Sequence, residues 1–291
     1  MNFTIEKANI DDLGIESELR HLIKEAFNSS TLFPARHLIN SIQNNASRPG
    51  FFLVANANGK IIGCNGFIAN DFNLNGLSYV GYQSCWSATD PDHRGKGVFT
   101  GIINEAKKLL KESGAGFLYG IPNNDSLPLF VNKLDFVETP SLVTRIPNIP
   151  FFRKYYFTKR SVAKTNACTI DEAQVAAHKS ALNPDAIKTI RYNDSWLWGK
   201  VLRKKKIGIT VPVFYVGGMN LADESDLMPI CIQLFREQNV LFIQLVSCKT
   251  NSLNVLVKGW RRANLNGFIF YNLNMPSIEH FNIMFGAIDV F

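Results

Sequence analysis

The chain has 291 residues, more than one domain usually contains, so its length predicts two domains of ordinary size. Hydrophobic residues make up 46% and charged residues 19%, which is typical of folded proteins and excludes a disordered chain, a collagen-like repeat and a disulfide scaffold. The net charge of +7 favours an anionic partner, such as a phosphorylated cofactor, a lipid surface or nucleic acid, without choosing among them.

The first elements predicted along the chain are a strand, two helices and an antiparallel meander. Residues 3–8 alternate as in a strand, and apolar residues at helical spacing follow Asp11-Asp12 and recur near residues 37–42. Three strands are then expected, joined by an Asn58-Gly59 hairpin turn and a second turn before Leu77; they cover residues 51–55, 61–68 and 77–88.

A glycine-containing turn at residues 90–97 separates this meander from the next predicted helix. The helix runs through Ile102 and Leu110 and ends at Ser113-Gly114. After it we expect a strand, a loop, a short helix and a further strand, at residues 117–121, 122–125, 127–133 and from Phe136.

The second half repeats a mixed order of strands and helices. Residues 140–166 show no clear period, so we expect a first domain at 1–145, a linker at 146–166 and a second domain at 167–291. In the second domain, the spacing of apolar residues predicts helices at 170–182, 226–238 and 252–263, with strands near 207–216, 240–246, 268–271 and 285–291. This order of strands and helices indicates a diverged copy of the first half.

The cysteines indicate neither a disulfide framework nor a metal site. They include no C-x-x-C pair and no histidine at zinc-like spacing, and they are Cys64, Cys85, Cys168, Cys231 and Cys248. Unpaired cysteines in apolar surroundings favour a reducing cytoplasm. The apolar runs are strand-sized and the N-terminus lacks a signal-peptide pattern, so we expect no membrane span and no export.

The turn Arg94-Gly95-Lys96-Gly97-Val98-Phe99 opens a helix and has the chemistry of a phosphate site. Glycines let the backbone approach an anion, the first amides of the helix point outward, and two cations lie beside them. A purely structural helix entry is the alternative. The dinucleotide fingerprint fails at Thr100, where it requires a third glycine, and the G-x-x-x-x-G-K-[ST] loop is absent.

With its flanks, this turn resembles motif A of the GNAT superfamily of acyl-coenzyme A N-acyltransferases. Arg94 and Gly97 match the [RQ]-x-x-G-x-[GA] pattern, while Phe99 replaces its last small residue. Downstream, Asn123 and the segment Lys133-Leu134-Asp135-Phe136 look like the family's asparagine and "lysine-leucine-glycine-phenylalanine" segment, with Asp135 in the glycine's place. The resemblance covers roughly residues 1 to 145.

The resemblance implies a mixed α/β (α+β) fold with a central, mainly antiparallel sheet flanked by helices, followed by a second GNAT-like domain. It implies acetyl-CoA as co-substrate and no metal. Ser87, Ala88 and Thr89 would pair with the pantetheine arm, which adds to the sheet like a strand. The pyrophosphate would lie on Arg94, Gly95, Lys96, Gly97, Val98, Phe99 and Thr100, and Asn123 and Ser126 would line the other side.

The catalytic groups are less clearly marked. Direct attack of an amine on the thioester needs a base and an acid but no enzyme nucleophile, so Cys85 is expected to pack in the sheet. In many relatives, a tyrosine that can protonate the departing thiolate stands where this chain has Val131. Tyr119 and Tyr82 are candidate substitutes for this tyrosine, although either could instead be a packing aromatic. Asp289 is a candidate base, although its segment could instead be a simple edge strand without a catalytic role.

The sequence therefore predicts an enzyme that moves an acetyl group from acetyl-CoA to a primary amine of a small molecule, in a ternary complex. The layout resembles bacterial two-domain GNAT proteins, some of which act on amino sugars, and the second domain would shape the acceptor site. The alternative is a non-catalytic coenzyme A binding or scaffold protein. No nucleic-acid motif accompanies the basic clusters, so nucleic acid is not expected as a partner, and the oligomeric state is not predicted.

Overall fold

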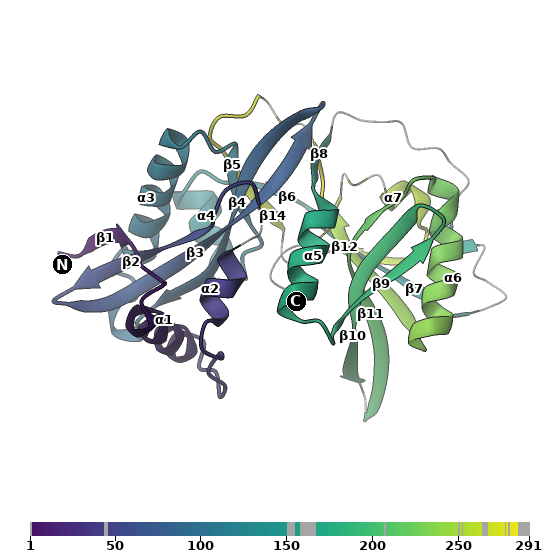
Figure 1. Ribbon diagram of the computed structural model, residues 1–291, viewed down its shortest axis with the longest axis horizontal. Coiled ribbons are helices and arrows are strands. Elements are labelled where there is room, and N and C mark those ends of the chain that lie inside the picture. Colours follow the sequence, from purple (N-terminus) through teal and green to yellow (C-terminus); the bar gives the residue numbers. More distant parts are fainter. Residues whose placement is uncertain are drawn as a thin grey trace. The chain divides into compact units, whose positions relative to one another are not determined.

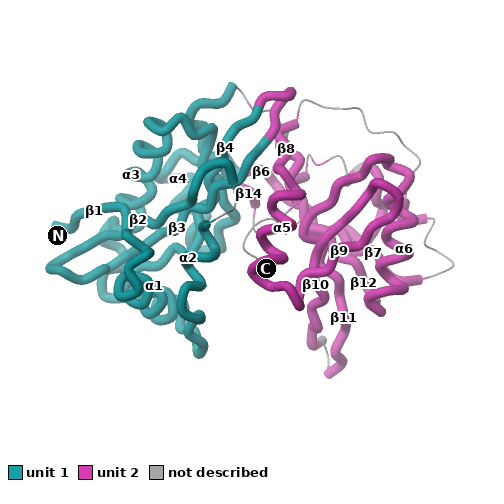
Figure 2. The backbone as a smooth tube through the Cα atoms, in the orientation of Figure 1, with its two compact units in different colours: residues 1–72, 78–138, 269–276 teal, residues 73–77, 139–268, 277–291 magenta. Residues whose placement is uncertain are grey.

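Two compact units make up the chain (Figure 2), and the computed structural model describes residues 2–43, 46–149, 155–157, 167–206, 208–249, 251, 253–263, 267–276, 278 and 280–284. The first unit comprises Met1–Phe72, Ser78–Glu138 and Ile269–Pro276. The second comprises Asn73–Leu77, Thr139–Phe268 and Ser277–Phe291. Neither unit is one continuous stretch of sequence.

The first unit is a mixed sheet with helices on both faces (Figure 1). In their order across the sheet, its strands are β1 (Thr4–Lys7), β2 (Phe51–Ala57), β3 (Lys60–Leu74), β4 (Leu77–Thr89), β5 (Phe117–Gly120), β14 (Phe268–Asn272) and β6 (Val137–Thr139). Its helices are α1 (Leu13–Ala26), α2 (His37–Ile42), the 3-10 turn η1 (Pro91–His93), α3 (Val98–Glu112) and α4 (Leu127–Lys133).

Strand β2 shows how the sequence builds these layers. Phe51, Leu53 and Ala55 pack in one cluster with α3, whereas Phe52 and Val54 pack in another with α1 and α2. Successive side chains of a strand point to opposite faces, so a strand covered on both sides is apolar at every position. The continuous apolar run that predicted a buried strand thus reflects helices above and below it.

The strand directions explain the position of the glycine turn. Strands β1, β2 and β3 pair antiparallel, and the predicted hairpin turn is confirmed, with Asn58 at φ 52° and Gly59 at φ 78°. Helix α3 then connects β4 to β5, which pair in parallel. A parallel connection returns over the face of the sheet, so the turn that enters α3 lies at the carboxyl end of β4.

The second unit has its own sheet, and in order across it the strands are β13 (Trp260–Ala263), β7 (Ser141–Pro147), β12 (Phe242–Cys248), β11 (Ile209–Asn220), β10 (Ser195–Lys206) and β9 (Ile187–Tyr192). The unit also contains β8 (Ala167–Ile170) and β15 (His280–Asn282), which pair in parallel. The helices are α5 (Glu172–Leu182), η3 (Glu224–Asp226), α6 (Leu227–Gln238) and α7 (Leu253–Leu256).

The second unit repeats the topology of the first. Strands β9, β10 and β11 form an antiparallel meander, and α6 then leads to β12, which is parallel to β11. Helix α6 packs Ile230, Leu234 and Phe235 against its sheet. The second unit therefore has a meander, helix and parallel strand in the same order as the first.

Three expectations about the second half need correction or lie outside the description. The stretch 140–166 was expected to be a connection, yet it contains β7, which pairs antiparallel with β12 and so draws residues 139–145 into the second unit. The helix expected at 252–263 is wrong, because only α7 is helical there and β13 follows it. The strand expected at 285–291 lies outside the described residues.

The five cysteines are buried and none forms a disulfide. Burial raises the pKa of the thiols of Cys64, Cys168, Cys231 and Cys248 to about 12, which leaves them uncharged and unreactive at neutral pH. Among the described residues, no helix is both long and apolar enough to cross a bilayer.

Candidate functional site

A pocket of about 690 Å³ lies over the glycine turn of the first unit. It is lined by the end of α1, the end of β4, the turn, the first residues of α3 and the start of α4; the residues are Ala26, Phe27, Ser87, Ala88, Thr89, His93, Arg94, Gly95, Gly97, Val98, Phe99, Thr100, Asn123, Asp125, Ser126, Leu129 and Lys133. The structure thus brings together every predicted cofactor residue except Lys96.

The backbone of the turn presents an open helix N-terminus to this pocket. Gly97 is the N-cap of α3 at φ 82°, with no side-chain cap among the described residues and no acidic residue in the first turn. Gly95 has φ 74°, and a Cβ at either glycine would contact nothing within 4 Å, so it is the left-handed backbone that requires glycine here. The first amides of α3 are available to an anion.

The cations of the turn are positioned differently from one another. The Arg94 guanidinium donates a hydrogen bond from Nη2 to the carbonyl of Ala26 at 2.8 Å, which holds it at the pocket's edge. The Lys96 ammonium instead donates to the carbonyl of Asp92 at 2.7 Å, and Lys96 does not line the pocket. Of the two, Arg94 is therefore better placed to meet an anionic guest.

Sequence reasoning missed Lys133, which adds a further positive charge to the pocket. Its signal was available, because Ser126, Leu129 and Lys133 are spaced three and four residues apart and share one face of α4. Asn123 shapes the loop before this helix, since its Oδ1 accepts hydrogen bonds from the Ser126 amide at 2.9 Å and from the Ser126 hydroxyl at 2.8 Å.

Asp90 anchors the turn to the sheet. Its carboxylate accepts from the Lys60 ammonium and from the Asp92 amide, at 2.8 and 2.9 Å, and it lies 3.4 Å from Nδ1 of His93. The hydrogen bond from Lys60 is the largest of the effects that lower the pKa of Asp90 to about 2. The charged carboxylate therefore fixes where the following glycines lie.

Strand β4 separates from β5 before it reaches the pocket. The two strands pair only over Gly81–Gln83, while β4 continues to Thr89. Trp86 lies in the part of β4 beyond Gln83 and has φ 53°, an unfavourable conformation for a residue with a side chain. Beneath it, buried Asn65 accepts hydrogen bonds at Oδ1 from the hydroxyls of Ser84 and Ser87. The backbone edge of Ser87–Thr89 can thus receive an extended arm.

The candidate catalytic tyrosines are packed inside the unit. Tyr119 is fully buried between the rings of Phe72 and Phe117, and its hydroxyl accepts a hydrogen bond from Nδ2 of Asn70 at 2.7 Å. Tyr82 is buried too, which raises the pKa of its phenol. Neither lines the pocket, so the geometry favours packing for both.

The remaining candidate, Asp289, lies outside the described residues. Among the residues that are described, no group of three or more His, Cys, Asp or Glu side chains could hold a metal ion.

Comparison with known proteins matches this region to one family. Residues 14–136 match the family model of an acetyltransferase (GNAT) domain. Curated protein sequences give no match to the chain.

Solved structures show the same fold over nearly the whole chain. A GCN5-related N-acetyltransferase from Kribbella flavida is 9% identical with a TM-score of 0.65; the match covers 94% of this chain and 71% of that one. One from Anabaena variabilis is 12% identical with a TM-score of 0.64, covering 94% and 73%. Eis1 from Mycobacterium abscessus is 11% identical with a TM-score of 0.61, covering 94% and 74%.

Proposed function

We propose, on the premise that residues 14–136 are a GNAT acetyltransferase domain, that this acyltransferase moves an acetyl group from acetyl-CoA to a primary amine of a small molecule. The acceptor class that we favour is the hydroxylated amines, which include amino sugars. The amine attacks the thioester directly in a ternary complex, so no covalent enzyme intermediate forms. The buried cysteines, none of which forms a disulfide, support a cytoplasmic location for this activity.

The observation that carries the proposal is the open N-terminus of α3 beneath a single pocket. The amides of Val98, Phe99 and Thr100 would hold the pyrophosphate together with Arg94. The pantetheine arm would then lie along the free edge of Ser87–Thr89 and extend the sheet. This direction brings the thioester towards the place where β4 and β5 separate.

The strained backbone at Trp86 suggests how the reaction is promoted. A left-handed residue inside a strand turns neighbouring amides out of the hydrogen-bonding ladder, and amides so released can stabilise the oxyanion of the tetrahedral intermediate. Because Tyr119 is buried and already hydrogen-bonded, we assign proton transfer to water. Such a proton path is slower than one with a positioned acid.

No tyrosine lines the described pocket, which also favours the second candidate, a non-catalytic coenzyme A binding protein. Acetyl-CoA should be mixed with a panel of primary amines that includes amino sugars, and thiol release should be followed. We expect release above the amine-free rate with at least one amine, and none with a Gly97→Glu variant. Tight coenzyme A binding without release for any amine would replace the enzyme with the binding protein.

A further inference from the structure

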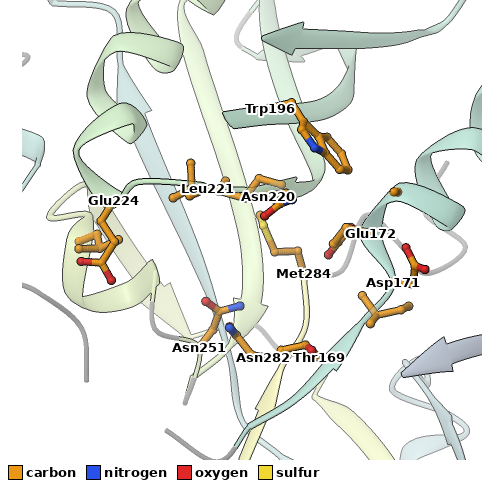
Figure 3. A pocket seen from close by; sticks show the side chains of 14 residues that line it. Thr169, Asp171, Glu172, Trp196, Asn220, Leu221, Glu224, Asn251, Asn282 and Met284 are labelled. Carbon is orange, nitrogen blue, oxygen red and sulfur yellow. The ribbon is translucent and has the colours of Figure 1, made fainter. Parts of the chain in front are cut away.

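A second pocket, of about 470 Å³, lies entirely within the second unit (Figure 3). It occupies the position that corresponds, in the repeated topology, to the cofactor pocket of the first unit: the carboxyl end of β11 and the turn that leads to α6. Its lining residues are Thr169, Ile170, Asp171, Glu172, Ala173, Trp196, Met219, Asn220, Leu221, Glu224, Asn251, Leu256, Asn282 and Met284.

The charge of this pocket is opposite to that of the cofactor pocket. Asp171 and Glu224 contribute carboxylates, whereas burial raises the pKa of Glu172 to about 8, and none of the lining residues that the structure describes is Lys, Arg or His. The whole chain carries a net charge of +7, so this negative lining is a local feature. Clefts lined by charge of one sign concentrate ligands of the opposite sign.

The carboxyl groups are spread along the pocket rather than gathered at one point. In Figure 3, Asp171 and Glu172 come from the start of α5, whereas Glu224 lies at the other end of the view. Among the described residues no group of such side chains could hold a metal ion. The spacing therefore suits an extended organic cation better than a single inorganic one.

The uncharged lining suits a ligand that also carries hydroxyl groups. Asn220, Asn251 and Asn282 can both donate and accept hydrogen bonds. Trp196 stands at the opposite side of the view from Asn251 and Asn282, and its ring offers a flat surface to a sugar face or to an ammonium group (Figure 3).

Adjacent glycines of β11 leave room for Glu172, a residue of the pocket lining. A Cβ at Gly218 would lie 1.7 Å from Oε2 of Glu172, and one at Gly217 would lie 2.3 Å from the ring of Trp198. Trp198 is fully buried, and its Nε1 donates to Oε2 of Glu172 at 3.3 Å. The missing side chains thus make room for a carboxyl group that a buried tryptophan holds in place.

We propose that this second pocket binds a small, hydroxylated organic polycation, such as an oligosaccharide that carries free amino groups, and that it does so independently of acetyl-CoA. Ammonium groups would meet Asp171 and Glu224, hydroxyl groups would meet the asparagines, and Trp196 would cover one face of the ligand. The first unit keeps the anionic cofactor, and the second takes a cation.

The test is a binding titration with a matched pair of sugars and no coenzyme A. Chitobiose carries two protonated amines, and N,N′-diacetylchitobiose is its neutral counterpart. We expect the wild-type chain to bind chitobiose at least tenfold more tightly than the diacetyl form. Equal affinities, or no binding of chitobiose, would overturn the proposal.

Matched variants locate the site. The double variant Asp171→Asn with Glu224→Gln keeps side-chain shape and the asparagine cap of α5, and it should weaken chitobiose binding at least tenfold. Glu237→Gln removes an acid of α6 that lies outside the pocket and should leave binding unchanged. If the double variant does not fold, as judged by a lost thermal unfolding transition, Glu224→Gln alone should still weaken chitobiose binding several-fold. Unaltered binding in a folded variant would contradict this site.

Discussion

The two units enter a helix from corresponding strands, and they do so with opposite chemistry. In the first unit, the turn from β4 to α3 contains Arg94, Lys96 and two glycines with left-handed backbone. In the second, the turn from β11 to α6 reads Leu221-Ala222-Asp223-Glu224-Ser225-Asp226, with neither a glycine nor a cation. The same topology therefore does not by itself create a phosphate site. The amides at a helix N-terminus bind an anion only where the neighbouring side chains are not acidic and leave the amides accessible.

The acidic turn of the second unit is engaged in local structure. Asp226 accepts hydrogen bonds from Nδ2 of Asn193 and from the hydroxyl of Ser195, at 3.0 and 2.7 Å, and Asp223 caps η3 through the amide of Ser225 at 2.7 Å. These carboxylates would repel a pyrophosphate. The comparison predicts one cofactor site per chain, located in the first unit.

The largest effect is expected from Gly97→Glu. The substitution places a carboxylate and a strained left-handed residue at the helix N-terminus, so coenzyme A affinity should fall more than 100-fold, as measured by calorimetry. Gly59→Glu is the matched control, because Gly59 has a similar φ of 78° and open space around it but lies in a hairpin turn. The Gly59→Glu variant should bind coenzyme A as tightly as the wild type. A loss of coenzyme A affinity as large as that of Gly97→Glu would mean that backbone strain alone is responsible.

A smaller effect is expected from removal of Arg94. Arg94→Ala should weaken coenzyme A about tenfold, the scale of one charge-assisted contact to phosphate, and the loss should shrink at high salt. Lys96→Ala should cost less than threefold, because the ammonium of Lys96 is directed to the Asp92 carbonyl. The reverse ranking in a titration at two salt concentrations would show that the turn rearranges on binding.

The second unit offers a test through Glu172, whose pKa burial raises to about 8. A raised carboxyl pKa means that the folded state resists ionisation, so this group lowers stability progressively as pH rises from about 4.5 to about 8. Glu172→Gln should therefore stabilise the chain by about 1 kcal/mol at pH 8 and by nothing at pH 4, read as the midpoint of thermal unfolding. An equal gain at both values would exclude the carboxyl charge as its cause.

The smallest effect is expected at Asp90, whose pKa is lowered to about 2. Its ionised form stabilises the fold above the unfolded-state pKa, and this contribution disappears as pH falls from about 4 to about 2. Asp90→Asn should cost less than about 1 kcal/mol near neutrality, because Lys60 is largely exposed, and nothing at pH 2. Unfolding curves that differ equally at both pH values would contradict this assignment.

Local pattern explains much of what the sequence predicted. The meander, α3, α4 and the phosphate turn depend on alternation, helical spacing and paired glycines, all of which are readable within a few residues. By contrast, β7 pairs with β12 about a hundred positions away, and β14 enters the first sheet beside β5. Such pairings are set by the fold, so a connection was predicted where β7 lies.

The candidate site residues also divide into those that local sequence predicts and those that depend on long-range packing. Most of the cofactor residues share one turn and its flanks, so their meeting in one pocket follows from local sequence, whereas Asn123 and Ser126 join them from the loop before α4. Whether a tyrosine faces a pocket depends on the whole sheet, and Tyr119 turned out to be buried against Phe72 and Phe117. The pocket of the second unit joins residues from 169 to 284, a set that no local pattern could have identified.

Equilibrium titration of coenzyme A into the full chain tests the central claim most directly. We expect one molecule bound per chain, with binding lost in Gly97→Glu and retained in Glu224→Gln. Two molecules per chain, or binding that survives Gly97→Glu, would show that the helix N-terminus of the first unit does not select the cofactor.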